Sequence, residues 1–227
     1  MRGIPSSLAL RPIPSARSMG MLGLASTAAV VGGSVVAAIP YAGWAGETYS
    51  PLNHFISELG EVGRSELAAV FNVCIVLGGL GFGLFVTLLS RRMIGLYRSS
   101  LAAAGLVTGL FGTLVGVFPM NYSPVHGFVA GMFFCTSWIA VAIFSVWLLT
   151  VPRPGLRRWL LAPGALGVAT ILSFVVVFAT YHPLPPGAHI IERPAVWTVP
   201  SLEWAALLTL MLWLSCVSVE LVRNGAE

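Results

Sequence analysis

Long apolar runs without charged residues constrain this chain more than any other feature of its sequence. A helix that crosses about 30 Å of hydrocarbon needs about 20 mostly apolar residues, and charged side chains are costly there. The third of five such runs is long enough for two helices, and the polar turn between Pro119 and Pro124 divides it. The runs lie at 18–46, 67–90, 99–152, 159–191 and 204–219.

These runs predict an all-α fold, a polytopic membrane bundle of six transmembrane helices. Hydrophobic residues make up 57% of the chain and charged residues 9%, whereas about a quarter of a soluble domain is charged. The same composition excludes a disordered chain, and three cysteines are too few for a disulfide scaffold. The expected spans are 18–40, 67–90, 99–118, 125–149, 159–181 and 200–222, in a transmembrane domain at 18–222 flanked by tails at 1–17 and 223–227.

Arginine placement predicts the orientation of the bundle. Six spans put both ends of the chain on one side of the membrane, and that side receives ten of the twelve arginines. Six of the eight acidic residues fall on the other side. The positive-inside rule then makes the N and C termini cytoplasmic in a multi-pass protein of a cell (inner or plasma) membrane. The net charge of +4 reflects this topology, so we expect the lipid bilayer as the partner, and no nucleic acid.

Residue usage favours a bacterial source, because arginine and glutamate are used without any lysine or aspartate, as in GC-rich genomes. One alternative concerns the first span. Its arginine-bearing start, its apolar run and the small residues Gly43 and Ala45 also fit a cleaved signal peptide. The run is longer than a usual signal core, and cleavage would leave five spans in the same orientation.

Small residues inside the spans predict close helix packing. Helices in lipid associate where glycines let their backbones approach. The third span carries glycines at spacings of four, three and four residues, and two other spans carry pairs four apart. These residues are Gly105, Gly109, Gly112 and Gly116, Gly79 and Gly83, and Gly127 and Gly131. The three cysteines also fall within spans, where a thiol behaves as a small hydrophobe.

The first outer loop holds the most structured polar sequence. Ser50 suits an N-cap, Pro51 the first helical position and Gly60 the C′ position, so we expect a short interfacial helix at 51–59. His54, Ser57 and Glu58 would share one face of this helix. His54 and Glu58 could bind one metal ion, share a proton or hydrogen-bond to each other.

All four histidines fall on the outer side. His126 follows Pro124 at the start of the fourth span, and the proline-rich third loop, expected to form a lid, carries the other two before Arg193. The candidate metal ligands are His54, Glu58, His126, His182 and His189. The candidate catalytic residues are His54, Ser57, Glu58 and His126. A divalent metal such as zinc is the cofactor that this set would suit, while the lack of histidines on the inner side argues against haem.

A family resemblance rests on the segment 53–60, NHFISELG, followed by Phe71 and Asn72 at the start of a glycine-rich span. It resembles the bacterial six-span membrane proteins grouped as domain of unknown function family 998, in which an Ile-Ser-acid-Leu-Gly string precedes the second span. That family more often has aspartate where this chain has Glu58.

Two further positions are similar to that family. Phe118, Pro119 and His126 resemble its junction between the third and fourth spans. Glu192 and Arg193 resemble its polar pair before the last span. The resemblance implies six spans and directs attention to the outer loops, but it names no reaction or substrate.

Three functions compete. The first is a non-enzymatic membrane or accessory protein that packs with a membrane protein partner, with a second copy of itself or with lipids. The second is a metal-dependent hydrolase that acts on a lipid or envelope ester at the outer leaflet, although no metalloprotease-like HExxH string is present. The third, a proton-coupled transporter, is disfavoured because the expected middle of the spans carries no ionisable residue.

Overall fold

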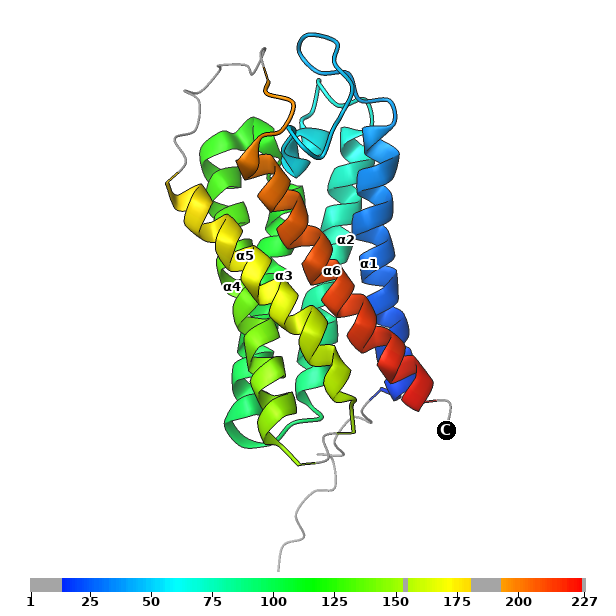
Figure 1. Cartoon of the computed structure of the whole chain (residues 1–227). Helices are drawn as coiled ribbons and strands as arrows, with labels where there is room; N and C mark the ends of the chain where they lie inside the picture. Colours follow the sequence, from blue (N-terminus) through cyan, green and yellow to red (C-terminus); the bar gives the residue numbers. More distant parts are fainter. Residues whose placement is uncertain (1–13, 153–154, 181–192, 226–227) are drawn as a thin grey trace, which may run out of the picture.

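The computed structural model describes residues 14–152, 155–180 and 193–225, and these residues form a bundle of six long helices (Figure 1). Each of the six is long and apolar enough to cross a membrane. The long helices are α1 (Ala16–Ala38), α2 (Ala68–Ser90), α3 (Gly95–Val117), α4 (Ser123–Thr150), α5 (Leu161–Ala179) and α6 (Thr198–Asn224). Three short 3₁₀ helices accompany them: η1 (Ile56–Gly60), η2 (Met120–Tyr122) and η3 (Arg158–Leu160).

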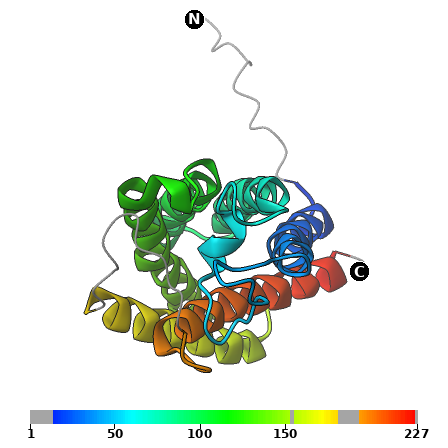
Figure 2. The ribbon, with the colours of Figure 1, turned by 90° about the horizontal axis from the view of Figure 1, so that it is seen from above.

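The helices pack in a closed ring. Each contacts its neighbours in sequence, and α6 returns to contact α1. Figure 2 shows α1 to α4 as an arc, with α5 and α6 lying along its open side. The start of α1 and the end of α6 meet at one end, called here the terminal end, where Gly225 packs against Arg17. The opposite end, called the loop end, carries residues 39–67 and the start of α6.

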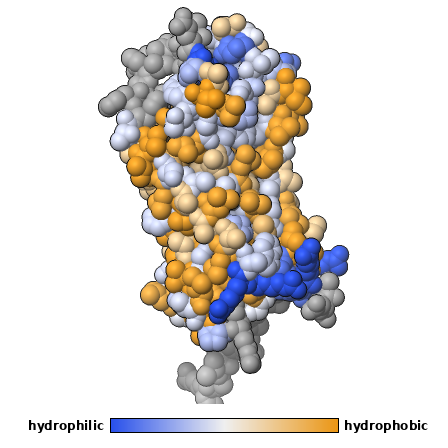
Figure 3. All heavy atoms as spheres, in the orientation of Figure 1, coloured by the Kyte–Doolittle hydropathy of each residue, from blue (hydrophilic) through white to orange (hydrophobic). Residues whose placement is uncertain are grey.

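The outer surface of the bundle is apolar over its middle. Figure 3 shows this apolar zone, with strongly hydrophilic side chains gathered below it at the terminal end. On α2, Val73, Leu77 and Leu80 follow one another at helical spacing and are each more than half exposed. Exposed apolar stripes of this kind are rare on soluble proteins. The surface therefore suits the interior of a lipid bilayer.

Glycines bring α2 and α3 into backbone contact. A Cβ atom built on Gly109 would lie 2.5 Å from the Cα of Gly83 and 3.0 Å from the carbonyl oxygen of Gly79. Gly79 in turn faces the backbone of Gly112. Real Cβ atoms do not approach backbone this closely, so any larger residue must push the two helices apart. The glycine spacing in these two helices thus becomes the seam between α2 and α3. The prediction fails for Gly127 and Gly131 of α4, because nothing lies within 4 Å of a Cβ built on either.

The first loop differs from the expected helix at 51–59. The chain makes turns at 51–54, and the helical segment is η1, which begins at Ile56. An α-helix would need the amide of Ile56 to bond the carbonyl of Leu52. Instead the Ile56 amide donates to Glu203 Oε2 at 2.8 Å, and the Leu52 carbonyl accepts from the Trp197 amide at 2.7 Å. Bonds to the α6 region therefore replace the helical bond on which the sequence signals depended.

We expect Gly109→Ala to destabilise the bundle. The added methyl group meets backbone rather than a movable side chain, and such overpacking costs about 1–3 kcal/mol. Thermal unfolding of the purified protein in detergent should show a lower melting temperature. Gly131→Ala in α4 is the matched control, because nothing lies within 4 Å of its new Cβ and alanine favours a helix by about 0.5–1 kcal/mol. Equal melting temperatures for the two variants would contradict the close α2–α3 contact.

Candidate functional site

The loop end contains a buried ion pair between Arg193, which precedes α6, and Glu58 in η1. The guanidinium Nη1 donates to Glu58 Oε1 at 3.0 Å, and Nη2 donates to Oε2 at 2.7 Å. The two side chains are 5% and 4% exposed. This two-point geometry is the strong form of an arginine–carboxylate pair. It joins positions 135 residues apart in sequence and fastens the first loop to the segment before α6.

Glu58 has further donors. The amide of Phe55 donates to Oε1 at 2.8 Å, and the hydroxyl of Tyr41 donates to Oε2 at 3.2 Å. Together with the two bonds from Arg193, four donors surround a carboxylate that offers about four lone-pair positions. The carboxylate is therefore fully engaged by the protein itself.

The charge of Glu58 keeps the Tyr41 phenol and the Arg193 guanidinium protonated. Burial raises the pKa of Tyr41, and the neighbouring Glu58 charge raises it further, so the phenol stays protonated and can donate. Burial alone would lower the pKa of Arg193, but the hydrogen bonds to Glu58, the charge of Glu58 and the nearby Tyr41 and Glu47 together raise it. The guanidinium thus stays charged beside the carboxylate.

His54 lies in a second layer with Glu47. The amide nitrogen of Asn53 donates to the Pro194 carbonyl at 3.0 Å, which turns its oxygen toward His54 Nδ1, 2.7 Å away. The Ser50 amide donates to the same Nδ1 at 3.3 Å. Burial lowers the pKa of His54, which favours the neutral ring, and the second ring nitrogen is Nε2.

That Nε2 faces Glu47 Oε1 at 3.6 Å, and Arg193 Nε lies 3.5 Å from the same oxygen. None of these three buried atoms has a hydrogen-bond partner among the described residues. Burial would raise the pKa of Glu47, but bonds from backbone amides, including that of Ala45, lower it. Gly43 accommodates this carboxylate, because a Cβ there would collide with it. A charged group of each sign therefore borders the histidine.

Two residues of α6 hold η1 from the other side. Glu203 accepts the Ile56 amide at 2.8 Å, and Trp204 Nε1 donates to the hydroxyl of Tyr49 at 2.9 Å. That hydroxyl donates to the Phe55 carbonyl at 3.0 Å, and burial raises the pKa of Tyr49 well above its usual value. We call the whole set the loop-end cluster. It comprises Tyr41, Glu47, Tyr49, Asn53, His54, Glu58, Arg193, Glu203 and Trp204.

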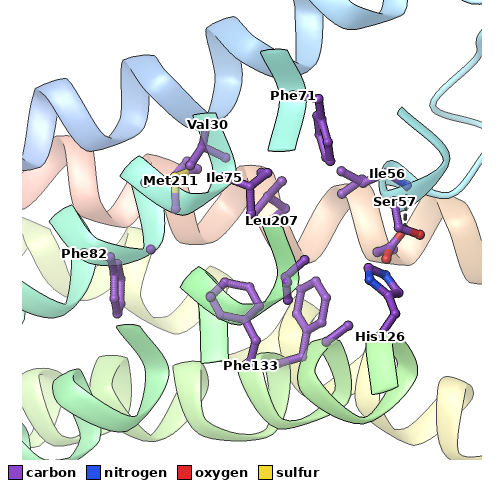
Figure 4. A pocket seen from close by; sticks show the side chains of 17 residues that line it. Val30, Ile56, Ser57, Phe71, Ile75, Phe82, His126, Phe133, Leu207 and Met211 are labelled. Atoms are coloured by element: carbon purple, nitrogen blue, oxygen red, sulfur yellow. Dashed lines mark hydrogen bonds between the residues drawn. The ribbon is translucent and has the colours of Figure 1, made fainter. Parts of the chain in front are cut away.

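His126 and Ser57 line a cavity inside the helix ring. His126 Nδ1 donates to the Phe118 carbonyl at 2.7 Å, which fixes this ring in the α4 region. Together with Glu203, its ring and Ser57 border a partly open cavity of about 60 Å³ (Figure 4). Fourteen of the seventeen lining residues are apolar. The structure thus places His54 and Glu58 in the hydrogen-bonded cluster, and Ser57 and His126 on the cavity wall.

In the part of the chain that the structure describes, no three His, Cys, Asp or Glu side chains gather in an arrangement that would hold a metal ion. His182, His189 and Glu192, with the expected lid, lie outside the described residues.

Several residues of the cluster were not predicted as site residues. The sequence named Arg193 only beside Glu192, as a polar pair, whereas the structure gives Arg193 and Glu203 long-range partners. Tyr41 and Glu47 carried no motif. One signal was available, because Arg193 is one of only two arginines on the arginine-poor side, and an isolated charge there needs a partner.

A family model described as "Protein of unknown function (DUF998)" matches residues 28–220. The chain belongs to the DUF998 family. The match extends from within α1 to near the end of α6 and so includes the cavity and the loop-end cluster of this DUF998 protein. Neither the curated proteins nor the solved structures gave a match.

We expect Glu58→Gln to destabilise the protein strongly. The amide keeps the size of the side chain but removes the two-point counter-ion of Arg193 and leaves only Glu47, 3.5 Å from Nε. Breaking a buried ion pair in this way typically costs about 3–5 kcal/mol. Thermal unfolding in detergent measures the loss, with exposed Arg92→Gln as the control. Adding Arg193→Met to Glu58→Gln should cost less than the sum of the two single changes, because the unpaired charge is gone. Additive effects would mean that the two side chains act independently.

Proposed function

We propose that this DUF998 protein is a non-enzymatic, multi-pass protein of the bacterial cell membrane, and that the loop-end cluster closes the outer end of its helix ring. The saturation of Glu58 carries this proposal. Four donors from the protein occupy its carboxylate, which leaves no position for a metal ion or a substrate proton. A residue held in this way stabilises structure rather than performing chemistry.

The surroundings of His54 support the same conclusion. A hydrolytic metal site needs ligands that converge and keep one coordination position open. His54 Nε2 does face a carboxylate, but the guanidinium of Arg193 lies 3.5 Å from that carboxylate and repels cations. His126 is held by the Phe118 carbonyl and lines the cavity. The two histidines therefore lie in different surroundings, His54 in the loop-end cluster and His126 on the cavity wall.

Orientation is part of the proposal. The loop end carries Arg64 and Arg193, whereas the other seven described arginines belong to the terminal end, so the positive-inside rule puts the loop end outside the cell. These seven are Arg17, Arg91, Arg92, Arg98, Arg157, Arg158 and Arg223.

Cysteine labelling should establish this orientation. In a background without the native cysteines, we expect Val62→Cys, which replaces a side chain that is 60% exposed, to react with a membrane-impermeant maleimide added to intact cells. Arg92→Cys at the terminal end should react only after the membrane is opened. Because both positions are exposed, the reverse pattern would invert the topology and place the loop end in the cytoplasm.

Metal analysis separates the proposal from the hydrolase alternative. Protein purified from cells grown with added zinc and manganese should contain far less than one metal ion per chain by mass spectrometry. A variant with His54→Ala and His126→Ala should show the same metal content. A stoichiometric metal that this double variant loses would overturn the proposal and favour a metal-dependent hydrolase at the outer leaflet.

A further inference from the structure

We infer that the terminal end binds the phosphate of one anionic phospholipid, at the corner where the start of α1, η3 and the end of α6 meet. The inference rests on the proposed function, whose orientation turns this end toward the cytoplasmic leaflet, and it names a lipid partner. Figure 3 shows strongly hydrophilic side chains at this end, directly below the apolar zone. Four arginines belong to this corner, called here the basic corner: Arg17, Arg157, Arg158 and Arg223.

Contacts between distant segments hold the basic corner together. The side chain of Asn224, at the end of α6, donates to the Gly155 carbonyl at 3.0 Å, two positions before Arg157. Gly225 packs against the backbone of Arg17 at the start of α1. The four arginines therefore surround the last turn of α6.

A buried acid orients one of these arginines. Arg157 Nε lies 3.5 Å from Oε1 of Glu220, and the Glu220 side chain is 2% exposed whereas that of Arg157 is 75% exposed. The two terminal nitrogens of Arg157 have no hydrogen-bond partner among the described residues. A guanidinium in this position offers paired N–H groups, which match two oxygens of a phosphate.

The basic corner carries more positive charge than the protein neutralises. Among the described residues of the terminal end, Glu220 is the one acidic residue, and it pairs with Arg157. Arg17, Arg158 and Arg223 form no ion pair with any described residue. Like charges gathered at one corner repel one another, so an anion placed among them is stabilised.

The apolar surface beside the basic corner favours a lipid over a soluble phosphate. Trp159, next to Arg158, is 45% exposed, and tryptophan is typical of the level of the lipid head groups. Leu208 and Leu212 of α6 are 45% and 46% exposed and share a face with Arg223. Between Leu208 and Arg223 the helix spans about 22 Å, which exceeds the hydrocarbon of one leaflet, about 15 Å. A lipid whose phosphate lies at the corner therefore has apolar helix surface beside its chains.

Native mass spectrometry of the full-length protein in detergent tests the inference. The protein is titrated with phosphatidylglycerol, which is anionic, and with phosphatidylcholine of the same acyl chains, which has no net charge. We expect one tightly bound phosphatidylglycerol per chain. Each arginine near an anionic membrane surface contributes about fivefold in affinity, so phosphatidylcholine should bind at least about fivefold more weakly. Equal affinities for the two lipids would overturn the inference without any variant.

Two double variants that lose the same charge test the location. Arg158→Gln with Arg223→Gln removes two arginines of the basic corner and should weaken phosphatidylglycerol binding about 25-fold. Arg92→Gln with Arg98→Gln is the matched control, because these residues lie after α2 and in the first turn of α3, which is opposite α6 in the helix ring. All four side chains are exposed, so both variants should fold. The control should keep nearly the full affinity, and equal losses in the two variants would overturn the assignment to the corner.

A soluble competitor separates the lipid from its head group. Glycerol 3-phosphate carries the phosphate without acyl chains, and an excess of it should not displace the bound phosphatidylglycerol. Complete displacement would make the basic corner a site for soluble phosphates and would overturn the inference.

Failure of this inference and failure of the proposed function are distinguishable. Lipid binding in detergent is measured whichever way the protein crosses the membrane and whether or not it holds a metal. Equal affinities for the two phospholipids would remove the inference alone. A stoichiometric bound metal would remove the non-enzymatic function and leave the phosphatidylglycerol result standing, and a reversed labelling pattern would move the bound lipid to the opposite leaflet.

Discussion

The contact between Arg193 and Glu58 governs the loop end of this protein. A guanidinium that is almost fully buried near the edge of the bilayer must have a counter-ion, because neither lipid nor apolar side chains can replace its hydration. The carboxylate that matches it lies in the first loop, so the pair draws the two ends of the helix ring together. Tyr41 and the Phe55 amide complete the shell around that carboxylate.

The same interaction explains why the first loop has its observed conformation. A regular helix at 51–59 would satisfy its amides internally and present His54 and Glu58 on one outer face. The chain instead uses the carbonyl of Leu52 for the Trp197 amide and offers the Ile56 amide to Glu203. Because the lost bond between Ile56 and Leu52 is replaced by two bonds to the α6 region, the exchange costs little hydrogen-bonding energy and gains the contact between loop and bundle.

These differences show how far the sequence could predict the structure. The six long helices were predicted correctly, because hydrocarbon thickness and charge cost act on contiguous residues and can be read from the chain directly. The prediction of a helix at 51–59 depended on capping signals at Ser50 and Gly60. These signals are local, and hydrogen bonds to the α6 region overrode them. Glu58 and Arg193 are 135 positions apart, and no periodicity connects them. His54 and Glu58 were expected to share a face, whereas different partners hold each of them.

The cavity and the close packing of α2 on α3 have a common origin in glycine. Gly79 and Gly112 belong both to the helix seam and to the cavity wall. A residue without a side chain lets one helix approach another and also leaves space on the side where no backbone fills it. Apolar residues such as Phe82 and Phe133 border that space but do not occupy it. An apolar void forfeits dispersion contacts, so a bundle that retains one loses stability unless something occupies it.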